Sequence, residues 1–310
     1  AGVKVLVFSA WPLAPVVTLR QGLRPRELDI KSLELPTEAK RVEALAKFRP
    51  IIESYIGRFN DPENYGFVPR YMQIQAGRDP TSGSGKRIFA RIKSLLRLLK
   101  PRMAYGAVVR ARLRRSFNRM AETTAPTGPY VYFPLHYEPE RTTNPDGGVF
   151  HDQLRTLAQL RAFVPASIAI CVKEHPSQFN ARMTGHQGRT ARFYKAVTAI
   201  SGVHLVAETL SSATLILNAQ AVATISGTVA LEAAILGKRG LVFGGAWFDG
   251  CPNVMRFTQA LDWETFCAAE PYDSREIGDW LYDRLEACGL PGCVNPSNEK
   301  YFAAHYADGS

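Results

Sequence analysis

The sequence has no long apolar run. None of its 310 residues belongs to a stretch of about 18 uncharged apolar residues, the minimum for a helix that crosses a bilayer. The first eight residues are too few and too weakly charged for a secretory signal peptide, and they resemble the start of a β-strand. A transmembrane protein is therefore not expected.

Cysteine is scarce and irregularly spaced. The five cysteines are Cys171, Cys251, Cys267, Cys288 and Cys293. An odd number at this spacing forms neither a disulfide framework nor paired zinc ligands, and reduced thiols are typical of the cytoplasm. The histidines likewise do not occur at metal-ligand spacing, and no aspartate-rich metal motif is evident. We predict a cytoplasmic protein without a metal site.

Acidic residues are absent from residues 86–119, although twelve basic residues occur there and the whole chain has a net charge of +10. The first half of this segment has the apolar spacing of an amphipathic helix. Four basic side chains cover much of its other side: Arg91, Lys93, Arg97 and Lys100. These residues could contact anionic lipid headgroups at the inner face of the cell membrane, attract an acidic acceptor glycan, or form a solvated helix face.

A second basic helix is predicted over residues 104–119. Nucleic-acid binding is not expected, because no recognised binding module accompanies the charge. Before this basic region, a helix is predicted over residues 37–56, and residues 77–85 have the composition of a linker.

From Tyr130 onward, short apolar strands alternate with helices. Strands are predicted at 130–133, 168–173, 203–206, 221–225 and 240–243, and helices at 152–163, 190–200, 211–217 and 228–236. This alternation is typical of a parallel sheet covered on both faces. A mainly helical tail is predicted over residues 274–306, with interruptions at Gly289, Pro291 and Gly292. We predict a division into residues 1–125, a basic helical region on the acceptor side, and residues 126–310, a nucleotide-sugar-binding domain.

The strongest local motif is the turn Ser226-Gly227-Thr228, which follows one predicted strand and opens a helix. Backbone amides at such a helix start, with the two hydroxyls, suit phosphate oxygens, and glycine permits close approach. Glu232 lies one turn later, where its carboxylate could accept hydrogen bonds from ribose hydroxyls. The alternative is an ordinary N-cap, in which a hydroxyl satisfies the free amides of the helix.

Two further polar motifs follow predicted strands. Lys173 and His175, in the sequence Lys-Glu-His-Pro, are candidates for phosphate binding, with solvated charges as the alternative. The loop after the strand at 130–133 carries His136, Glu138 and Glu140, which are candidates for a general base or for holding a donor sugar. Solvated or paired charges are again the alternative. We take His136, Glu138 and His175 as the catalytic candidates.

Together, the sequence at 132–140, Lys-Glu-His-Pro at 173–176 and Ser-Gly-Thr-Val-Ala-Leu-Glu-Ala at 226–233 resemble the bacterial capsule polysaccharide biosynthesis family, which includes Kdo transferases. The resemblance covers residues 130–245. It implies an α/β, GT-B-like fold with a Rossmann-like parallel-sheet domain in the C-terminal half. It also implies a donor site at Lys173, His175, Ser226, Gly227, Thr228 and Glu232 that binds a nucleotide, often CMP.

The sequence departs from that family in residues 1–125, where neither a full Rossmann domain nor a Gln-x-x-x-Asp pattern is found. We expect a smaller or diverged, helix-rich N-terminal part. The leading hypothesis is metal-independent transfer of a sugar from a nucleotide-sugar, which is a substrate and not a cofactor, to a surface polysaccharide or its lipid-linked primer. The alternatives are polyol-phosphate transfer from a CDP-glycerol-type donor, sugar epimerisation, and a non-catalytic scaffold or membrane-surface module.

Overall fold

The computed structural model describes residues 6–10, 16–21, 42–43, 45–46, 48–57, 59, 101–139, 146–181, 183–268 and 270–291. Several predicted features lie outside these residues. They are the basic patch of Arg91, Lys93, Arg97 and Lys100, the linker at 77–85, and Glu140.

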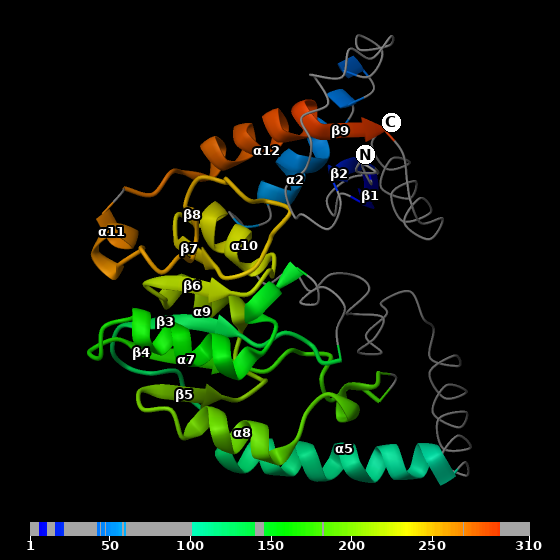
Figure 1. Ribbon diagram of the computed structural model, residues 1–310, viewed down its shortest axis with the longest axis vertical. Helices are drawn as coiled ribbons and strands as arrows, with labels where there is room; N and C mark the ends of the chain where they lie inside the picture. The colour runs from blue at the N-terminus through cyan, green and yellow to red at the C-terminus, as the bar shows by residue number, and fades with distance from the viewer. Residues whose placement is uncertain are drawn as a thin grey trace, which may run out of the picture. The chain divides into compact units, whose positions relative to one another are not determined.

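A six-stranded sheet forms the centre of the fold, in the order β5-β4-β3-β6-β7-β8 (Figure 1). The strands are β3 (Tyr130–Pro134), β4 (Ala169–Lys173), β5 (Val203–Val206), β6 (Ala221–Thr224), β7 (Arg239–Val242) and β8 (Val254–Arg256). The pairs β3–β4, β3–β6, β4–β5 and β7–β8 are all parallel. All residues of β6 and nearly all of β3 and β4 are buried, as expected for strands covered on both faces. The predicted α/β class with a parallel sheet is confirmed.

The helices between these strands begin where the sequence provides caps. They are α7 (Gln153–Phe163), α8 (Ala191–Thr198), α9 (Ser212–Asn218) and α10 (Val229–Ile235). Asp152, Thr190 and Ser211 each accept a hydrogen bond from an amide in the first turn of α7, α8 and α9, respectively. The predicted basic helix is α5 (Pro101–Met120), which begins three residues earlier than expected.

The described chain forms two compact units that are interleaved along the sequence. Unit 1 contains residues 1–65, 142–151 and 224–310, and unit 2 contains residues 66–141 and 152–223. This is a different kind of division from the boundary at residues 125 and 126, which stays a prediction. Each unit is described by itself below.

Unit 1 combines elements that the sequence predicted, namely a first strand, a helix within residues 37–56 and a helix from residue 274, with others that it did not predict. Strands β1 (Leu6–Ala10), β2 (Val16–Gln21) and β9 (Gly289–Pro291) form an antiparallel sheet. Helices α2 (Arg49–Gly57), α11 (Trp263–Ala268) and α12 (Ser274–Cys288) belong to the same unit, with the 3-10 turn η3 (Gly148–Phe150). An apolar cluster joins Ile52 of α2, Leu231 of α10 and Leu281 of α12.

The sequence prediction was incomplete for three strands of these regions. The expected first strand is β1, but its partner β2 was not predicted. Helix α12 ends at Cys288, where the sequence predicted an interruption, and Gly289 begins β9, which pairs with β2 far away in the sequence. Strand β8 was missed because its three residues are only partly buried or exposed and make no apolar run.

Unit 2 places α5 beside α8 and the 3-10 turn η4 (Gly185–Gln187) (Figure 1). Leu113 and Phe117 form the buried side of α5, and the Phe117 ring contacts the rings of Phe179 and Tyr194 at centroid distances of 5.3 and 5.2 Å. Of the helices described, none is both long and apolar enough to span a bilayer. Cys171, Cys251, Cys267 and Cys288 are free thiols, as predicted, and Cys293 lies outside the described residues.

Candidate functional site

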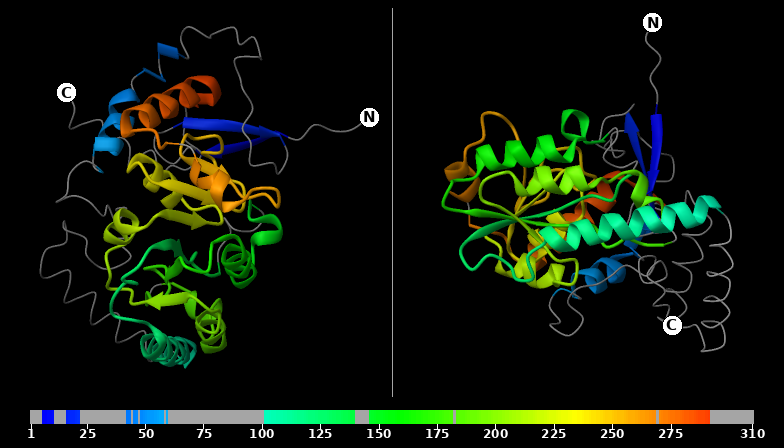
Figure 2. Two further views of the ribbon diagram at one scale, coloured as in Figure 1. Left: turned by 90° about the vertical axis from the view of Figure 1, so that its left-hand side faces the viewer. Right: turned by 90° about the horizontal axis from the view of Figure 1, so that it is seen from below.

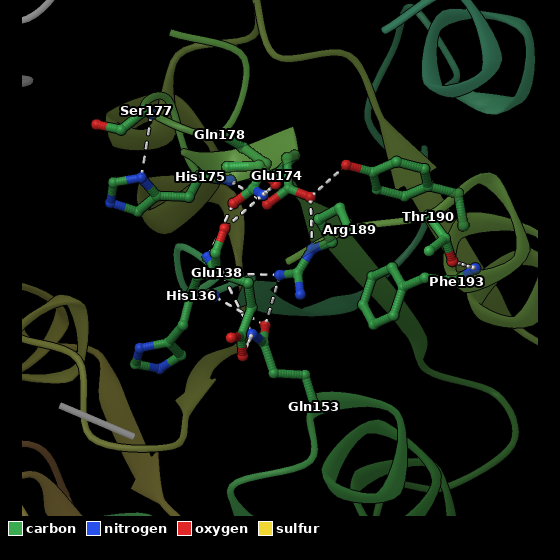
Figure 3. Close-up of polar contacts among 12 residues, drawn as sticks. His136, Glu138, Gln153, Glu174, His175, Ser177, Gln178, Arg189, Thr190 and Phe193 are labelled. Carbon is green, nitrogen blue, oxygen red and sulfur yellow. Dashed lines mark hydrogen bonds and ion pairs between the residues drawn. The ribbon is translucent and has the colours of Figure 1, made fainter. Parts of the chain in front are cut away.

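The loop after β3 is held by two buried glutamine side chains, one beside His136 and one beside Glu138 (Figure 3). Gln153 accepts a hydrogen bond from the His136 amide (2.9 Å) and donates one to the His136 carbonyl (3.2 Å). Gln178 makes the same pair of bonds with the amide and carbonyl of Glu138, both at 2.9 Å. Each glutamine side chain therefore makes the two hydrogen bonds that a neighbouring strand would make with the backbone. The loop backbone is fixed in this way at His136 and at Glu138.

A buried ion pair between Glu174 and Arg189 also holds the loop after β3. The side chains of Glu174 and Arg189 are 0% and 2% exposed, and Arg189 Nε lies 3.0 Å from Glu174 Oε2. Arg189 also donates to the His136 carbonyl (2.7 Å), while the Tyr194 hydroxyl donates to Glu174 (2.6 Å). Burial, and secondly the charge of Glu174, raise the pKa of Tyr194, so its phenol stays protonated and keeps donating. Buried charges are tolerated when they are paired and hydrogen-bonded in this way.

The same carboxylate fixes the backbone of His175. The His175 amide donates to Glu174 Oε1 (2.7 Å), and the Ser177 amide donates to His175 Nδ1 (3.1 Å). Because Nδ1 accepts a hydrogen bond, the neutral imidazole carries its proton on Nε2. The rings of His175 and His136 both project away from the Glu174–Arg189 pair (Figure 3). His175 is thus oriented as a hydrogen-bond donor.

Tyr137 lies between His136 and Glu138, the two loop residues whose backbone is held by glutamine side chains. Its ring is edge-on to the His175 ring at a centroid distance of 6.0 Å. Its hydroxyl accepts a hydrogen bond from the Thr184 amide (3.0 Å) and lies 3.3 Å from Thr184 Oγ1. The loops after β3 and β4 therefore present an aromatic side chain next to the imidazole.

Two glycines allow these loops to approach each other closely. A Cβ atom on Gly188 would lie 2.4 Å from the carbonyl carbon of Glu138, and one on Gly185 would lie 2.2 Å from the carbonyl oxygen of Gln178. Contacts under 3.0 Å to backbone atoms cannot be relieved by rotating a side chain. The sequence therefore needs glycine at both positions for steric reasons.

Lys173 is buried at the end of β4, and its ammonium group faces the start of α9. It donates to the Leu210 carbonyl and to Ser212 Oγ (2.9 Å), and only 5% of the residue is exposed. Burial lowers the pKa of Lys173 to about 8. Two of its three donors are therefore engaged within the protein, and a phosphate-binding role for this residue stays a prediction.

The carboxylate of Glu138 is positioned by the same glutamine that holds the loop. Gln153 Nε2 donates to Glu138 Oε1 at 2.9 Å. Glu138 is half-buried, whereas His136 is buried. Unit 2 thus brings His136, Glu138 and His175, the three catalytic candidates, to loops that share one hydrogen-bond network.

Unit 1 contains the turn at Ser226-Gly227-Thr228. Thr228 is the N-cap residue of α10 but makes no side-chain capping bond, and its hydroxyl lies 3.4 Å from Glu232 Oε1. The alternative of an ordinary hydroxyl N-cap is therefore not what the structure shows. Ser226 Oγ is buried and has no hydrogen-bond partner among the described residues. An unpaired buried hydroxyl is costly, so this group is suited to a ligand atom.

Glu232 carries a carboxyl group whose charge is disfavoured by its surroundings. The residue is partly exposed, but desolvation by the surrounding protein raises its pKa to about 7, against a smaller opposing effect of the Thr228 hydroxyl. Near neutral pH a fraction of Glu232 is therefore protonated, and its carboxyl group can donate as well as accept hydrogen bonds.

A glycine pair holds this turn in place. The Gly244 amide donates to the Ile225 carbonyl, and the Gly245 amide donates to the Asp146 carbonyl, both at 2.7 Å. A Cβ on Gly244 would approach the Asp146 oxygen to 2.7 Å. The turn is therefore packed against two neighbouring backbone segments, while the Ser226 hydroxyl makes no bond to them.

The predicted site residues divide between the two units. His136, Glu138, Lys173 and His175 belong to unit 2, and Ser226, Gly227, Thr228 and Glu232 belong to unit 1. Sequence reasoning missed Gln153, Gln178 and Arg189, which lie 15 to 53 residues from the groups they hold, and it did not single out Tyr137. In the part of the chain that is described, no group of three or more His, Cys, Asp or Glu side chains is arranged to bind a metal ion.

The family model described as "Capsule polysaccharide biosynthesis protein" matches residues 91–253, which is more than half of the chain. The chain therefore belongs to this family, in agreement with the resemblance seen in its motifs. The match includes every candidate residue of both units that the structure describes. No curated protein matches the sequence.

Two solved structures from Thermosulfurimonas dismutans are similar to part of the chain. One is KpsC, beta Kdo 2,7 transferase, at 16% identity and a TM-score of 0.35, covering 55% of this chain and 51% of that one. The other is KpsC, beta Kdo 2,4 transferase, at 16% identity and a TM-score of 0.31, covering 57% and 53%. The chain thus matches about half the length of each structure.

Proposed function

We propose that this member of the capsule polysaccharide biosynthesis family is a glycosyltransferase that uses a nucleotide-activated sugar, with a CMP-Kdo-like donor as the leading candidate. The acceptor is a capsule or other surface polysaccharide, or its lipid-linked primer. The observation that carries the proposal is the pair of hydrogen-bonded loops after β3 and β4, which hold a carboxylate, a phenol and a donor-oriented imidazole in fixed positions. Such preorganised polar groups are the main means by which enzymes stabilise charge that develops during reaction.

His175 is proposed to donate a hydrogen bond from Nε2 to a phosphate oxygen of the nucleotide. The bond from its Nδ1 to the Ser177 amide supports this role over that of a base, because it leaves the proton on Nε2. Tyr137, edge-on to His175, is proposed to contact the nucleoside. Lys173 is proposed to act as a positioning residue, since its bonds to Leu210 and Ser212 fix the end of β4 next to His175.

The turn of unit 1 is proposed to bind the donor through Ser226, Gly227 and Thr228, with Glu232 on ribose hydroxyls. The buried, unpaired Ser226 hydroxyl supports this assignment, because a ligand oxygen or N–H would give it the partner it lacks. The Thr228 hydroxyl does not cap α10, and its hydrogen bond to Glu232 places it beside the carboxyl group proposed to contact the ribose.

In the proposed reaction, the bond between the anomeric carbon and the donor phosphate oxygen breaks, and a bond from an acceptor hydroxyl forms. The nucleotide leaves with the electron pair of the broken bond, and a base takes the hydroxyl proton. Glu138 is proposed as that base, because Gln153 fixes one of its oxygens while the residue stays partly exposed. His136 is the alternative, and loss of turnover in Glu138→Gln but not in His136→Gln distinguishes the two.

Thermal unfolding with CMP, CDP, UMP, UDP and GDP tests the donor class. A ligand that binds only the folded state raises the midpoint, by an amount equivalent to about 2.7 kcal/mol at a concentration of 100 times Kd. We expect CMP to give the largest shift and His175→Ala to abolish it. The exposed His151, outside both loops after β3 and β4, provides a matched control in His151→Ala.

Product analysis separates transfer from the alternatives. Release of the nucleotide only when an acceptor glycan is present supports glycosyl transfer, whereas turnover of CDP-glycerol would indicate polyol-phosphate transfer instead. The absence of any shift and any turnover in the folded full chain would contradict the proposal and favour a scaffold.

A further inference from the structure

Helix α5 carries an exposed face whose composition sets it apart from the rest of the described surface. Tyr105 and Val108 are 71% and 51% exposed, and they are two of only five large apolar side chains that are strongly exposed among the described residues. Three arginines on the same helix are also exposed: Arg112, Arg115 and Arg119. The helix has no acidic residue from Pro101 to Met120.

These five side chains form one continuous stripe. At about 100° per residue, positions 105, 108, 112, 115 and 119 fall within an arc of about 80°, over a length of about 21 Å. The apolar pair lies toward the N-terminus of α5 and the arginines toward its C-terminus. We call these five residues the α5 stripe.

The opposite side of α5 is fully engaged in unit 2. Leu113 and Phe117 are buried there, and Gly106 lies against the His186 ring. Arg114, on another side, pairs with Glu208 and lies over the Phe179 ring. Among the described residues of unit 2, the α5 stripe therefore takes no part in holding the helix. Seen from below, no described helix or strand lies in front of α5 (Figure 2).

We propose that the α5 stripe docks the protein onto an anionic lipid surface, with Tyr105 and Val108 entering the headgroup region and the three arginines contacting lipid phosphates. The charge argument is that exposed arginines without any acidic neighbour on the helix gain by approaching a negative surface. The chemical argument is that an exposed valine gains more from the acyl region of a lipid interface than from the hydroxyl-rich surface of a polysaccharide, and tyrosine suits the boundary between water and acyl chains. Docking here is independent of the proposed donor site.

Sedimentation of the full chain with vesicles tests the proposal. The vesicles contain roughly 30% phosphatidylglycerol in phosphatidylcholine, with pure phosphatidylcholine for comparison. The variant Arg112→Gln/Arg115→Gln/Arg119→Gln keeps good helix formers, and we expect it to bind anionic vesicles on the order of 100-fold more weakly. The control is Arg155→Gln/Arg192→Gln/Arg275→Gln, which makes the same change in net charge at exposed positions outside α5.

A second variant tests the apolar half of the stripe. Raising the salt from about 0.05 to about 0.5 M screens the arginines, so the binding that remains depends on apolar insertion. We expect Tyr105→Ser/Val108→Ser to lose about 10-fold of this salt-resistant binding. Because all five side chains are exposed, the thermal midpoint of each variant is expected to stay at the wild-type value, which shows that the variants are folded.

The proposal is overturned if the α5 triple variant and the control triple variant bind anionic vesicles equally well. It is also overturned if the wild type binds neither kind of vesicle but binds a soluble acidic polysaccharide such as polygalacturonate in a way that the α5 triple variant loses. Equal binding to neutral and anionic vesicles would likewise contradict it.

Discussion

The loops after β3 and β4 in unit 2 and the turn at residues 225–228 in unit 1 both follow buried parallel strands, yet their polar groups are used in opposite ways. In the loops, Gln153, Gln178 and Glu174 have partners at nearly every polar atom that the structure records. In the turn, Ser226 Oγ has no partner and Thr228 does not cap its helix.

This comparison distinguishes polar residues whose hydrogen bonds are satisfied within the protein from polar residues that have an unpaired group. The buried polar side chains of the loops hold the loop backbone in one conformation, because a buried polar network that is fully satisfied fixes a single conformation. The Ser226 hydroxyl remains available, so a ligand there gains a hydrogen bond without breaking an existing one. Substitutions of Gln153, Gln178 or Glu174 should therefore mainly change stability, and substitution of Ser226 should mainly change binding.

The largest effect is expected from breaking the buried ion pair. Arg189→Met leaves the Glu174 carboxylate buried without its counter-charge, which should lower the free energy of unfolding by about 3–5 kcal/mol. Urea unfolding measures this loss, with Arg192→Met, at an exposed position in the first turn of α8 and three residues after Arg189, as the control. Equal losses in the two variants would show that the pair does not stabilise the loops.

The turn is expected to show the stronger pH dependence. Because the pKa of Glu232 is raised to about 7 in the folded state, the folded state holds a proton more tightly than the unfolded state does. This contribution to stability is complete below the unfolded pKa, near 4.3, and is lost as the pH rises through 7. Relative to Glu232→Gln, the wild type should lose up to about 3 kcal/mol over that range, reduced by solvent screening of this partly exposed group.

Urea unfolding at pH 4.5, 6 and 8 gives the wild-type and Glu232→Gln curves for this comparison. Parallel curves would contradict the assignment of the pH dependence to Glu232.

Close packing of the loops is tested by Gly188→Ala. The new Cβ would meet Glu138 backbone atoms, and the resulting shift should lower the free energy of unfolding by about 1–3 kcal/mol. Gly128→Ala is the matched control in the same unit, because a Cβ there meets nothing within 4 Å. The measurement is the difference in thermal midpoint, and equal midpoints for the two variants would argue against steric selection of glycine.

The smallest change in stability is expected at Ser226. Ser226→Ala removes a buried hydroxyl that has no partner, so the free energy of unfolding should change by no more than about 1 kcal/mol, toward greater stability. The same variant should weaken CMP binding by roughly tenfold, the value of one hydrogen bond to an ionised group. Unchanged CMP binding, measured by titration calorimetry, would remove Ser226 from the proposed donor site.

Local sequence patterns predicted much of the central sheet. The strands at 130–133, 203–206 and 221–225 were placed to within one residue at each end, because buried parallel strands are continuous apolar runs. The helices at 152–163, 190–200 and 211–217 were also predicted, and in the structure each begins one residue later, after the N-cap Asp152, Thr190 or Ser211. Strands β2, β8 and β9 were missed. The strands β8 and β9 have three residues each and lie at a sheet edge, and β2 lies between β1 and β9, so all three gain stability from partners that their own composition does not reveal.

The sequence by itself determined the α/β class, the parallel strands and the motifs that place this chain in the capsule polysaccharide biosynthesis family, since periodicity, caps and short motifs are local properties of a chain. Only the tertiary structure decided what each polar residue of those motifs does. Glu174, within Lys-Glu-His-Pro, is buried against Arg189 and Tyr194, whereas the Ser226 hydroxyl is buried with no partner among the described residues. The partner of a buried group, or the lack of one, depends on residues tens of positions away, and no local pattern records them.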